Sequence, residues 1–172
     1  MSSSKIAARA FLFAVLAPGS VTVLGPFLVL QAEHGSSLPV GPARFAGLGP
    51  IVIGAAILAW CIVDFVRSGR GTPAPWDAPK HLVTRGLYRV ARNPMYLGIV
   101  CTLAGEALLF RSAWILGYAA VVFVVFHLFV TVYEEPTLRR QFGPSYVGYC
   151  DSVNRWIPRP PSPASIPRTD SR

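Results

Sequence analysis

Charged residues are scarce in this chain, and acidic residues are the scarcest of them. Asp and Glu number 8 against 16 Lys and Arg in 172 residues, and charged residues make up 14% of the whole. Soluble globular domains carry about one quarter charged residues, so the composition excludes an ordinary soluble domain. The net charge of +8 is not organised into any known nucleic-acid-binding module, and we therefore expect no nucleic-acid partner.

Cysteine is almost absent as well. Of the three cysteines, Cys61 and Cys101 fall within apolar runs, and Cys150 follows far along the chain. Disulfide scaffolds are built from several paired cysteines, so we expect no disulfide framework. We also expect no bound metal.

What the sequence has in abundance is apolar residues. They make up 52% of the chain, and the mean hydropathy is +0.46. A membrane helix needs about 20 mostly apolar residues, and residues 6–30, 45–66 and 113–133 meet that length. The fourth apolar stretch, Pro94–Phe110, is shorter and can span where the bilayer thins or neighbours pack against it. The predicted fold is all-α: a polytopic helical membrane protein with about four transmembrane helices.

The distribution of positive charge predicts the topology. With four spans and a cytoplasmic N-terminus, every Lys and Arg lies on the cytoplasmic side except Arg44 and Arg111. Cytoplasmic loops carry the excess of Lys and Arg in membrane proteins. We therefore expect an integral protein of a bacterial-type inner membrane, with both termini in the cytoplasm and membrane lipids around it.

The connections predict how the chain is divided. Arg111-Ser112 is so short a link that the two spans beside it should form an antiparallel hairpin. Residues 136–154 have apolar side chains at helical spacing and predict a cytoplasmic C-terminal helical segment, interrupted at Gly143-Pro144. We predict one membrane domain over residues 1–158, and a proline-rich, disordered tail over residues 159–172.

Two polar groups stand out at the cytoplasmic ends of the apolar runs. One is Arg92-Asn93-Pro94 with Tyr96; the other is Glu134-Glu135. Interfacial anchoring and solvated acids explain each group alone. The alternative is a polar site in which one glutamate faces the bundle and the other faces water, since helix neighbours diverge by about 100°. His127 lies two turns before Glu134 on the same face, roughly 10 Å deeper.

These groups belong to a longer pattern. The pattern comprises Leu82-Val83-Thr84, Gly86, Tyr88, Arg92-Asn93-Pro94, Tyr96, Gly98, Glu134-Glu135, Leu138, Phe142-Gly143, Tyr146 and Tyr149, and it closes with Val153, Arg155 and Ile157-Pro158. It resembles the isoprenylcysteine carboxyl methyltransferase family, and the related phospholipid N-methyltransferases share much of the layout. The resemblance covers residues 80–158, while the first two spans match only in character.

The resemblance implies an enzyme that uses S-adenosylmethionine at the cytoplasmic membrane face. It implies methyl transfer to a lipophilic small molecule, such as the carboxylate of an isoprenoid-type compound. By position in the pattern, the implied cofactor-binding residues are Lys80, His81, Leu82, Val83, Gly86, Tyr88, Arg92, Asn93, Pro94, Met95, Tyr96, Glu134 and Glu135.

Two positions depart from the family's pattern. Many members have Arg-His-Pro where this chain has Asn93 between Arg92 and Pro94, and animal members have an arginine where this chain has Val130. The acceptor is therefore left open between a carboxylate and the amine of a phospholipid or small molecule. The candidate acceptor-side or catalytic residues are His127 and Arg155. An alternative of another class is a non-catalytic membrane binding or assembly protein.

Overall fold

The computed structural model describes residues 16–33, 41–68, 82 and 84–159, and within them every regular element is helical. In chain order the elements are η1 (Ser20–Leu24), α2 (Gly25–Ala32), η2 (Pro42–Gly47), α3 (Leu48–Ser68), η3 (Gly86–Arg89), α4 (Pro94–Phe110), α5 (Ala113–Phe129), η4 (Val130–Glu134), α6 (Glu135–Phe142) and α7 (Pro144–Ser152). The all-α prediction is confirmed for this part of the chain.

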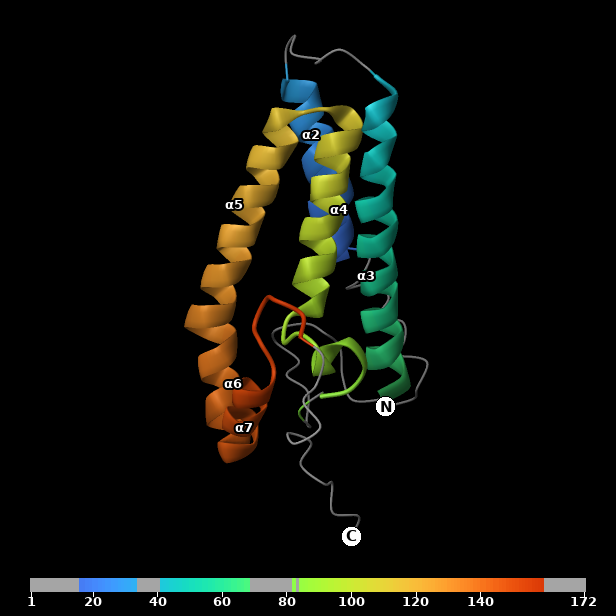
Figure 1. The fold of residues 1–172 in the computed structure, drawn as a ribbon. Helices are drawn as coiled ribbons and strands as arrows, with labels where there is room; N and C mark the ends of the chain where they lie inside the picture. Colours follow the sequence, from blue (N-terminus) through green and yellow to red (C-terminus); the bar gives the residue numbers. More distant parts are fainter. Residues whose placement is uncertain (1–15, 34–40, 69–81, 83, 160–172) are drawn as a thin grey trace.

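The long helices lie side by side along one axis, with α4 in the middle (Figure 1). Two of them are long and apolar enough to cross a membrane, Pro42–Asp64 and Ala113–Phe142. The other two, Leu16–Ala32 and Pro94–Phe110, are apolar but shorter. Large apolar side chains face outward, as Val132 does with 74% of its surface exposed. The structure thus shows an apolar helical bundle with two helices of spanning length, and it does not confirm four spans.

Glycines set the close packing of α3 and of the turn before it against α4. A Cβ atom at Gly54 would collide with the backbone at Gly98 and with Thr102, and one at Gly105 would collide with the backbone at Gly47 and Ile51. Small residues let helix backbones approach closely, which replaces hydrophobic driving force in an apolar solvent. The glycines therefore position α4, and with it the residues at its N-terminal end, which is the lower end in Figure 1.

The connection between α4 and α5 is the predicted antiparallel hairpin. Arg111 adopts a left-handed conformation with φ 52°, which ends α4. Ser112 then caps α5, because its hydroxyl accepts a hydrogen bond from the Ile115 amide at 3.2 Å. A second hydroxyl bond, from Ser112 to a Glu33 carboxylate oxygen at 2.6 Å, fastens this turn to the end of α2.

Two π-helical segments each end two residues before a proline. η1 ends at Leu24 before Pro26, and η4 ends at Glu134 before Pro136. A proline has no N–H, and its ring clashes with the carbonyl four residues earlier, so widening the preceding turn accommodates it. The consequence for the site is that the helix beginning at Ala113 continues without a break through the two glutamates to Phe142.

The predicted break at Gly143-Pro144 is confirmed. Gly143 has φ 52° and separates α6 from α7. After α7 the chain turns back and passes between the lower ends of α4 and α5 (Figure 1). Arg159 donates its amide hydrogen to the Val90 carbonyl at 2.9 Å. The remainder of the predicted tail lies outside the described residues.

Candidate functional site

The two adjacent glutamates have different partners. Glu134 accepts a hydrogen bond from the Tyr96 hydroxyl at 3.2 Å. Glu135 is 6% exposed, and its carboxylate is held by two nitrogens of Arg155 at 2.7 and 2.9 Å. Arg92 adds a third contact at 3.0 Å. The expectation that one of the pair faces water is wrong, because the C-terminal segment returns over it and supplies Arg155.

Glu135 therefore joins three separate parts of the chain. Arg92 comes from the segment before α4, Glu135 from the first turn of α6, and Arg155 from the chain beyond α7. Bidentate contact between a guanidinium and a carboxylate fixes both planes as well as the distance. The Glu135 hydrogen bond also raises the pKa of Arg155, so this arginine stays charged throughout the physiological range.

Asn93 also holds the C-terminal segment in place. The side chain is 7% exposed, and its amide nitrogen donates to the Arg155 carbonyl at 3.3 Å. The Arg92 amide donates to the Asn154 carbonyl at 2.9 Å. Both residues were predicted to contact a cofactor. The structure shows them holding the chain's own backbone, and cofactor contact stays a prediction for them.

Tyr88 and Gly86 lie in η3, beside the lower end of α3. The Tyr149 hydroxyl donates to the Tyr88 carbonyl at 2.7 Å, which ties α7 to this segment. Burial raises the pKa of both tyrosines, so their hydroxyls remain protonated donors. Gly86 has φ 56°, and a Cβ there would collide with the Asp64 carboxylate. Gly86 therefore lets η3 approach α3 closely.

A cluster of rings continues from Tyr96 into the bundle. Its ring lies 4.5 Å from Phe126 and 6.5 Å from Trp156, measured between centroids. The Trp156 indole donates a hydrogen bond to Nδ1 of His127 at 3.1 Å and lies 5.1 Å from the Phe123 ring. Trp156 thus connects the C-terminal segment to α5.

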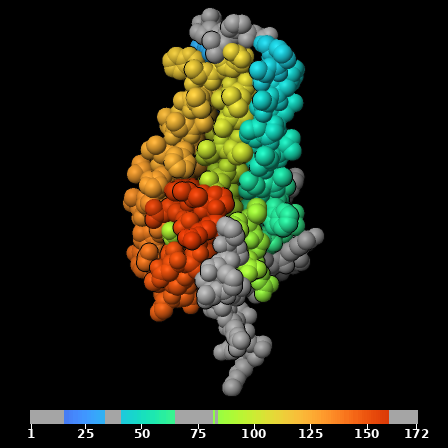
Figure 2. Space-filling view, viewed as in Figure 1, coloured from blue at the N-terminus to red at the C-terminus, as the bar shows by residue number. Residues whose placement is uncertain are grey.

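The space-filling view shows from outside how the C-terminal segment lies against the helices. The red C-terminal residues cover the face between α5, in orange, and the green and teal atoms of the chain around α4 and α3 (Figure 2).

Trp156 was not predicted as a site residue. It occupies an undefined position of the pattern, between Arg155 and Ile157, and no periodicity marks it. Phe123 and Phe126 were missed because they read as ordinary apolar residues of a span.

The predicted site residues thus fall into four sets, of which one is the pair Gly86 and Tyr88 in η3. Tyr96, Glu134, Glu135, Arg92 and Asn93 are joined directly or through Arg155, and His127 joins them through Trp156. Three predicted residues, Lys80, His81 and Val83, lie outside the described residues. The last set, Leu82, Pro94 and Met95, makes no polar side-chain contact in the described part, and Pro94 is the first residue of α4.

A carboxylate beside aromatic faces suits a cationic ligand. Glu134 uses one oxygen for Tyr96, and its other oxygen has no partner among the described residues. The ring of Tyr96, whose hydroxyl meets Glu134, and the ring of Trp156, whose centroid lies 6.5 Å from that of Tyr96, supply negative π faces. Across the described residues, no group of three His, Cys, Asp or Glu side chains is placed to hold a metal ion.

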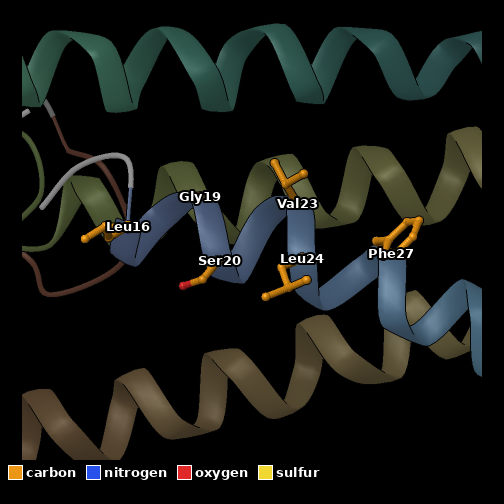
Figure 3. A pocket seen from close by; sticks show the side chains of 6 residues that line it. All are labelled: Leu16, Gly19, Ser20, Val23, Leu24 and Phe27. Atoms are coloured by element: carbon orange, nitrogen blue, oxygen red, sulfur yellow. The ribbon is translucent and has the colours of Figure 1, made fainter. Parts of the chain in front are cut away.

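An open groove lies elsewhere, on the first helix (Figure 3). It has a volume of about 400 Å³ and is lined by Leu16, Gly19, Ser20, Val23, Leu24 and Phe27. None of these residues belongs to the glutamate and aromatic clusters. The groove is almost wholly apolar and is separate from the polar site.

Comparison of the sequence with known proteins shows which family the chain is related to. The family described as phospholipid methyltransferase matches residues 43–145. The chain belongs to this family. It is 30% identical to protein-S-isoprenylcysteine O-methyltransferase A of Arabidopsis thaliana over 114 residues, which are 65% of the chain and 57% of that protein. It is 32% identical to form B of the same plant over 114 residues, again 65% of the chain and 57% of that protein.

A rice relative gives a similar result. The chain is 29% identical to a probable protein-S-isoprenylcysteine O-methyltransferase of Oryza sativa subsp. indica over 117 residues, 66% of the chain and 60% of that protein. The chain thus matches less than two thirds of the length of these relatives. No solved structure matches it significantly. The predicted resemblance to isoprenylcysteine and phospholipid methyltransferases is confirmed.

The match to the phospholipid methyltransferase family covers only part of the site. It includes Arg92, Tyr96 and the two glutamates, and it ends before Arg155 and Trp156. The C-terminal segment that closes over the glutamates is therefore described by this structure and not by the family match.

Proposed function

We propose that this chain transfers a methyl group from S-adenosylmethionine to a lipophilic acceptor at the cytoplasmic face of a membrane. The observation that carries the proposal is the contact between Tyr96 and Glu134 at the lower end of the apolar bundle. Membership of the family supports methyl transfer, and the names of the relatives support a lipophilic acceptor.

The residues present fit the methyl donor. S-adenosylmethionine has an ammonium and a sulfonium, and when bound it supplies an electrophilic methyl group. The free oxygen of Glu134 is the group in this cluster suited to an ammonium. Tyr96 and Trp156 offer π faces to a sulfonium. The side chain of Arg155 is 31% exposed, and its Nη1 has no partner in the described part of the chain. This nitrogen can therefore meet the carboxylate of the methyl donor.

The protein's contribution would be alignment and exclusion of water. The Glu135 pair with Arg155 and Arg92 fixes the C-terminal segment over the site. A fixed cover holds reactants in line and keeps water from competing for the methyl group. The ion pair would thus hold Arg155 and Trp156 of this cover where they can meet the methyl donor.

The proposed location follows the charge pattern. The predicted domain over residues 1–158, with its motif-bearing part over 80–158, would lie in a bacterial-type inner membrane with both termini in the cytoplasm. Two helices of spanning length support membrane association.

The second candidate is methylation of an amine, and the description of the matching family as phospholipid methyltransferase favours it. An amine acceptor must lose a proton, so a base would be needed. A non-catalytic binding or assembly protein would need neither a methyl acceptor nor a base.

Calorimetry with S-adenosylmethionine and its demethylated product tests the proposal. The wild-type protein in detergent should bind both. Glu134→Gln should weaken binding about tenfold or more, because a charge-assisted contact is lost. Asp151→Asn, a change on the exposed side of α7, is the matched control and should bind normally. Absence of binding by the folded wild type would refute the proposal.

A further inference from the structure

The last long helix contains one widened turn, η4, just before its two glutamates. There the Glu135 amide donates to the Val130 carbonyl, five residues back, where an α-helix would use the carbonyl four residues back. A π-helical bond therefore encloses one residue more than an α-helical bond. Because the turn holds this extra residue, everything beyond it is rotated by about 100° compared with an uninterrupted α-helix.

The contacts with α4 show the effect of the extra residue. In an α-helix, residues seven apart face within about 20° of one another, and residues eight apart diverge by about 80°. Here two residues eight apart share a partner, since the Tyr96 ring lies 4.5 Å from Phe126 and its hydroxyl meets Glu134. Tyr133, seven residues after Phe126, is instead 50% exposed. The widened turn has thus exchanged the residue that faces α4.

The same shift holds on the side of the C-terminal segment. The Trp156 indole donates to His127, and its neighbour Arg155 holds Glu135, eight residues further along the helix. These two helix residues therefore face the same returning segment. The expectation that His127 and Glu134, which are seven residues apart, share a face is wrong. The widened turn moves Glu134 toward α4, and Glu135 takes its place.

The sequence of the turn explains why it is wide. Pro136 has no N–H, and in an α-helix its ring would clash with the Val132 carbonyl four residues earlier. The Thr131 hydroxyl donates to the His127 carbonyl at 2.7 Å, which gives that carbonyl a partner inside the widened segment. The proline and the threonine thus favour the wide form locally.

The first helix contains the same arrangement. η1 ends two residues before Pro26, and the Gly25 amide donates to the Ser20 carbonyl, five residues back. The Thr22 hydroxyl, inside that turn, donates to the Pro18 carbonyl at 2.8 Å. None of these residues belongs to the glutamate or aromatic clusters. A wide turn before a proline therefore forms in this chain without the contacts that the glutamates make.

We propose that η4 aims the two glutamates, and that Pro136 is a positioning residue that acts through them. The turn directs Glu134 to Tyr96, where the methyl donor would bind. It directs Glu135 to Arg155, which fixes the C-terminal segment. In an uninterrupted α-helix, Glu134 would face the C-terminal segment and neither glutamate would face Tyr96. The role in cofactor binding rests on the proposed function, whereas the register of the helix does not.

Removing the extra residue tests the register. The shortened variant lacks Val132, which is 74% exposed, and carries Pro136→Ala, so that a plain α-helix can form. Glu134 is then seven residues from Phe126 and keeps its direction. Binding of S-adenosylmethionine, measured by calorimetry in detergent, should stay within about twofold of the wild type. Pro136→Ala alone should bind about fivefold or more weakly, because the helix can then take the other register.

The matched control adds a residue in place of removing one. In this lengthened variant an alanine follows Val132, again with Pro136→Ala. The insertion rotates both glutamates by about 100° or more, and affinity should fall about tenfold or more. Binding by the lengthened variant as tight as by the shortened one would overturn the proposal, and so would loss of binding in the shortened one. Wild-type affinity in Pro136→Ala alone would overturn the role of the proline.

Thermal unfolding without cofactor reads the register independently of methyl transfer. Glu135 is held by two arginines, and Glu134 has one hydrogen bond. Glu135→Gln should therefore lower Tm more than Glu134→Gln, both in the wild type and in the shortened variant. In the lengthened variant that difference should disappear.

The two assays separate the two levels of failure. If Tm follows this order but the wild type binds no S-adenosylmethionine, the register is right and the proposed function fails. A shortened variant that does not fold, or in which Glu134→Gln and Glu135→Gln lower Tm equally, would overturn the proposal whatever the binding results.

Discussion

Replacing Glu135 with Gln removes the charge that joins three segments of the chain. The carboxylate is almost buried and meets Arg155 through two bonds and Arg92 through one. Gln keeps one acceptor oxygen, turns an NH₂ donor toward a guanidinium in place of the other, and leaves two guanidinium groups without their counter-charge. We expect the C-terminal segment to loosen and the fold to lose stability.

The size of the loss follows from burial. Removing one partner of a buried ion pair costs about 3–5 kcal/mol. The side chain of Arg155 is 31% exposed and that of Arg92 is 13% exposed, so water can partly replace the lost contact. We therefore expect the lower end, about 3 kcal/mol. For a chain of this size, that lowers Tm by about 6–12 °C, at roughly 2–4 °C per kcal/mol.

Thermal unfolding in detergent, followed by circular dichroism and without cofactor, measures this loss. The matched control is Glu134→Gln, the same substitution one residue earlier. Glu134 has one hydrogen bond, at 3.2 Å, so its loss should cost about 1 kcal/mol. Equal falls in Tm for both variants, or a fall of under about 2 °C for Glu135→Gln, would refute the distinction between the two glutamates.

Further stability predictions use the same unfolding assay. Tyr149→Phe removes the 2.7 Å bond to the Tyr88 carbonyl and should cost about 1 kcal/mol. Ser112→Ala removes the cap of α5 and should also cost about 1 kcal/mol. Gly54→Val should push α3 away from Gly98 and cost about 1–3 kcal/mol. Burial raises the pKa of Tyr149, so the native state holds the phenol proton more tightly, and stability should fall as pH rises above about 10; Tyr149→Phe should reduce that fall.

Local sequence signals predicted the helices where the signals were strong. Pro94 begins α4 and Phe110 ends it, as the apolar run and its flanking proline indicate. The turn at Arg111-Ser112 and the break at Gly143 follow from residues whose conformational preferences act within a few positions. Each of these features depends on neighbours in sequence, and a single sequence carries that information.

The site was only partly predictable, because its decisive contacts join distant segments. Tyr96 and Glu134 were expected in one site from the resemblance, and the structure places them in contact. The return of the chain past Trp156 was not expected, since nothing in the composition of the segment after α7 shows what it packs against. The burial of Glu135 was missed for the same reason: Arg155, which covers it, is 20 residues away along the chain.

Methyl transfer itself is the most direct test of the account. The purified chain, restored to lipid vesicles, is incubated with methyl-labelled S-adenosylmethionine and a membrane lipid extract, and the products are separated by solvent extraction. We predict label in lipophilic products, and about tenfold less of it with Glu134→Gln when the cofactor concentration lies below its Kd. No labelled product, or label confined to water-soluble products, would contradict the account.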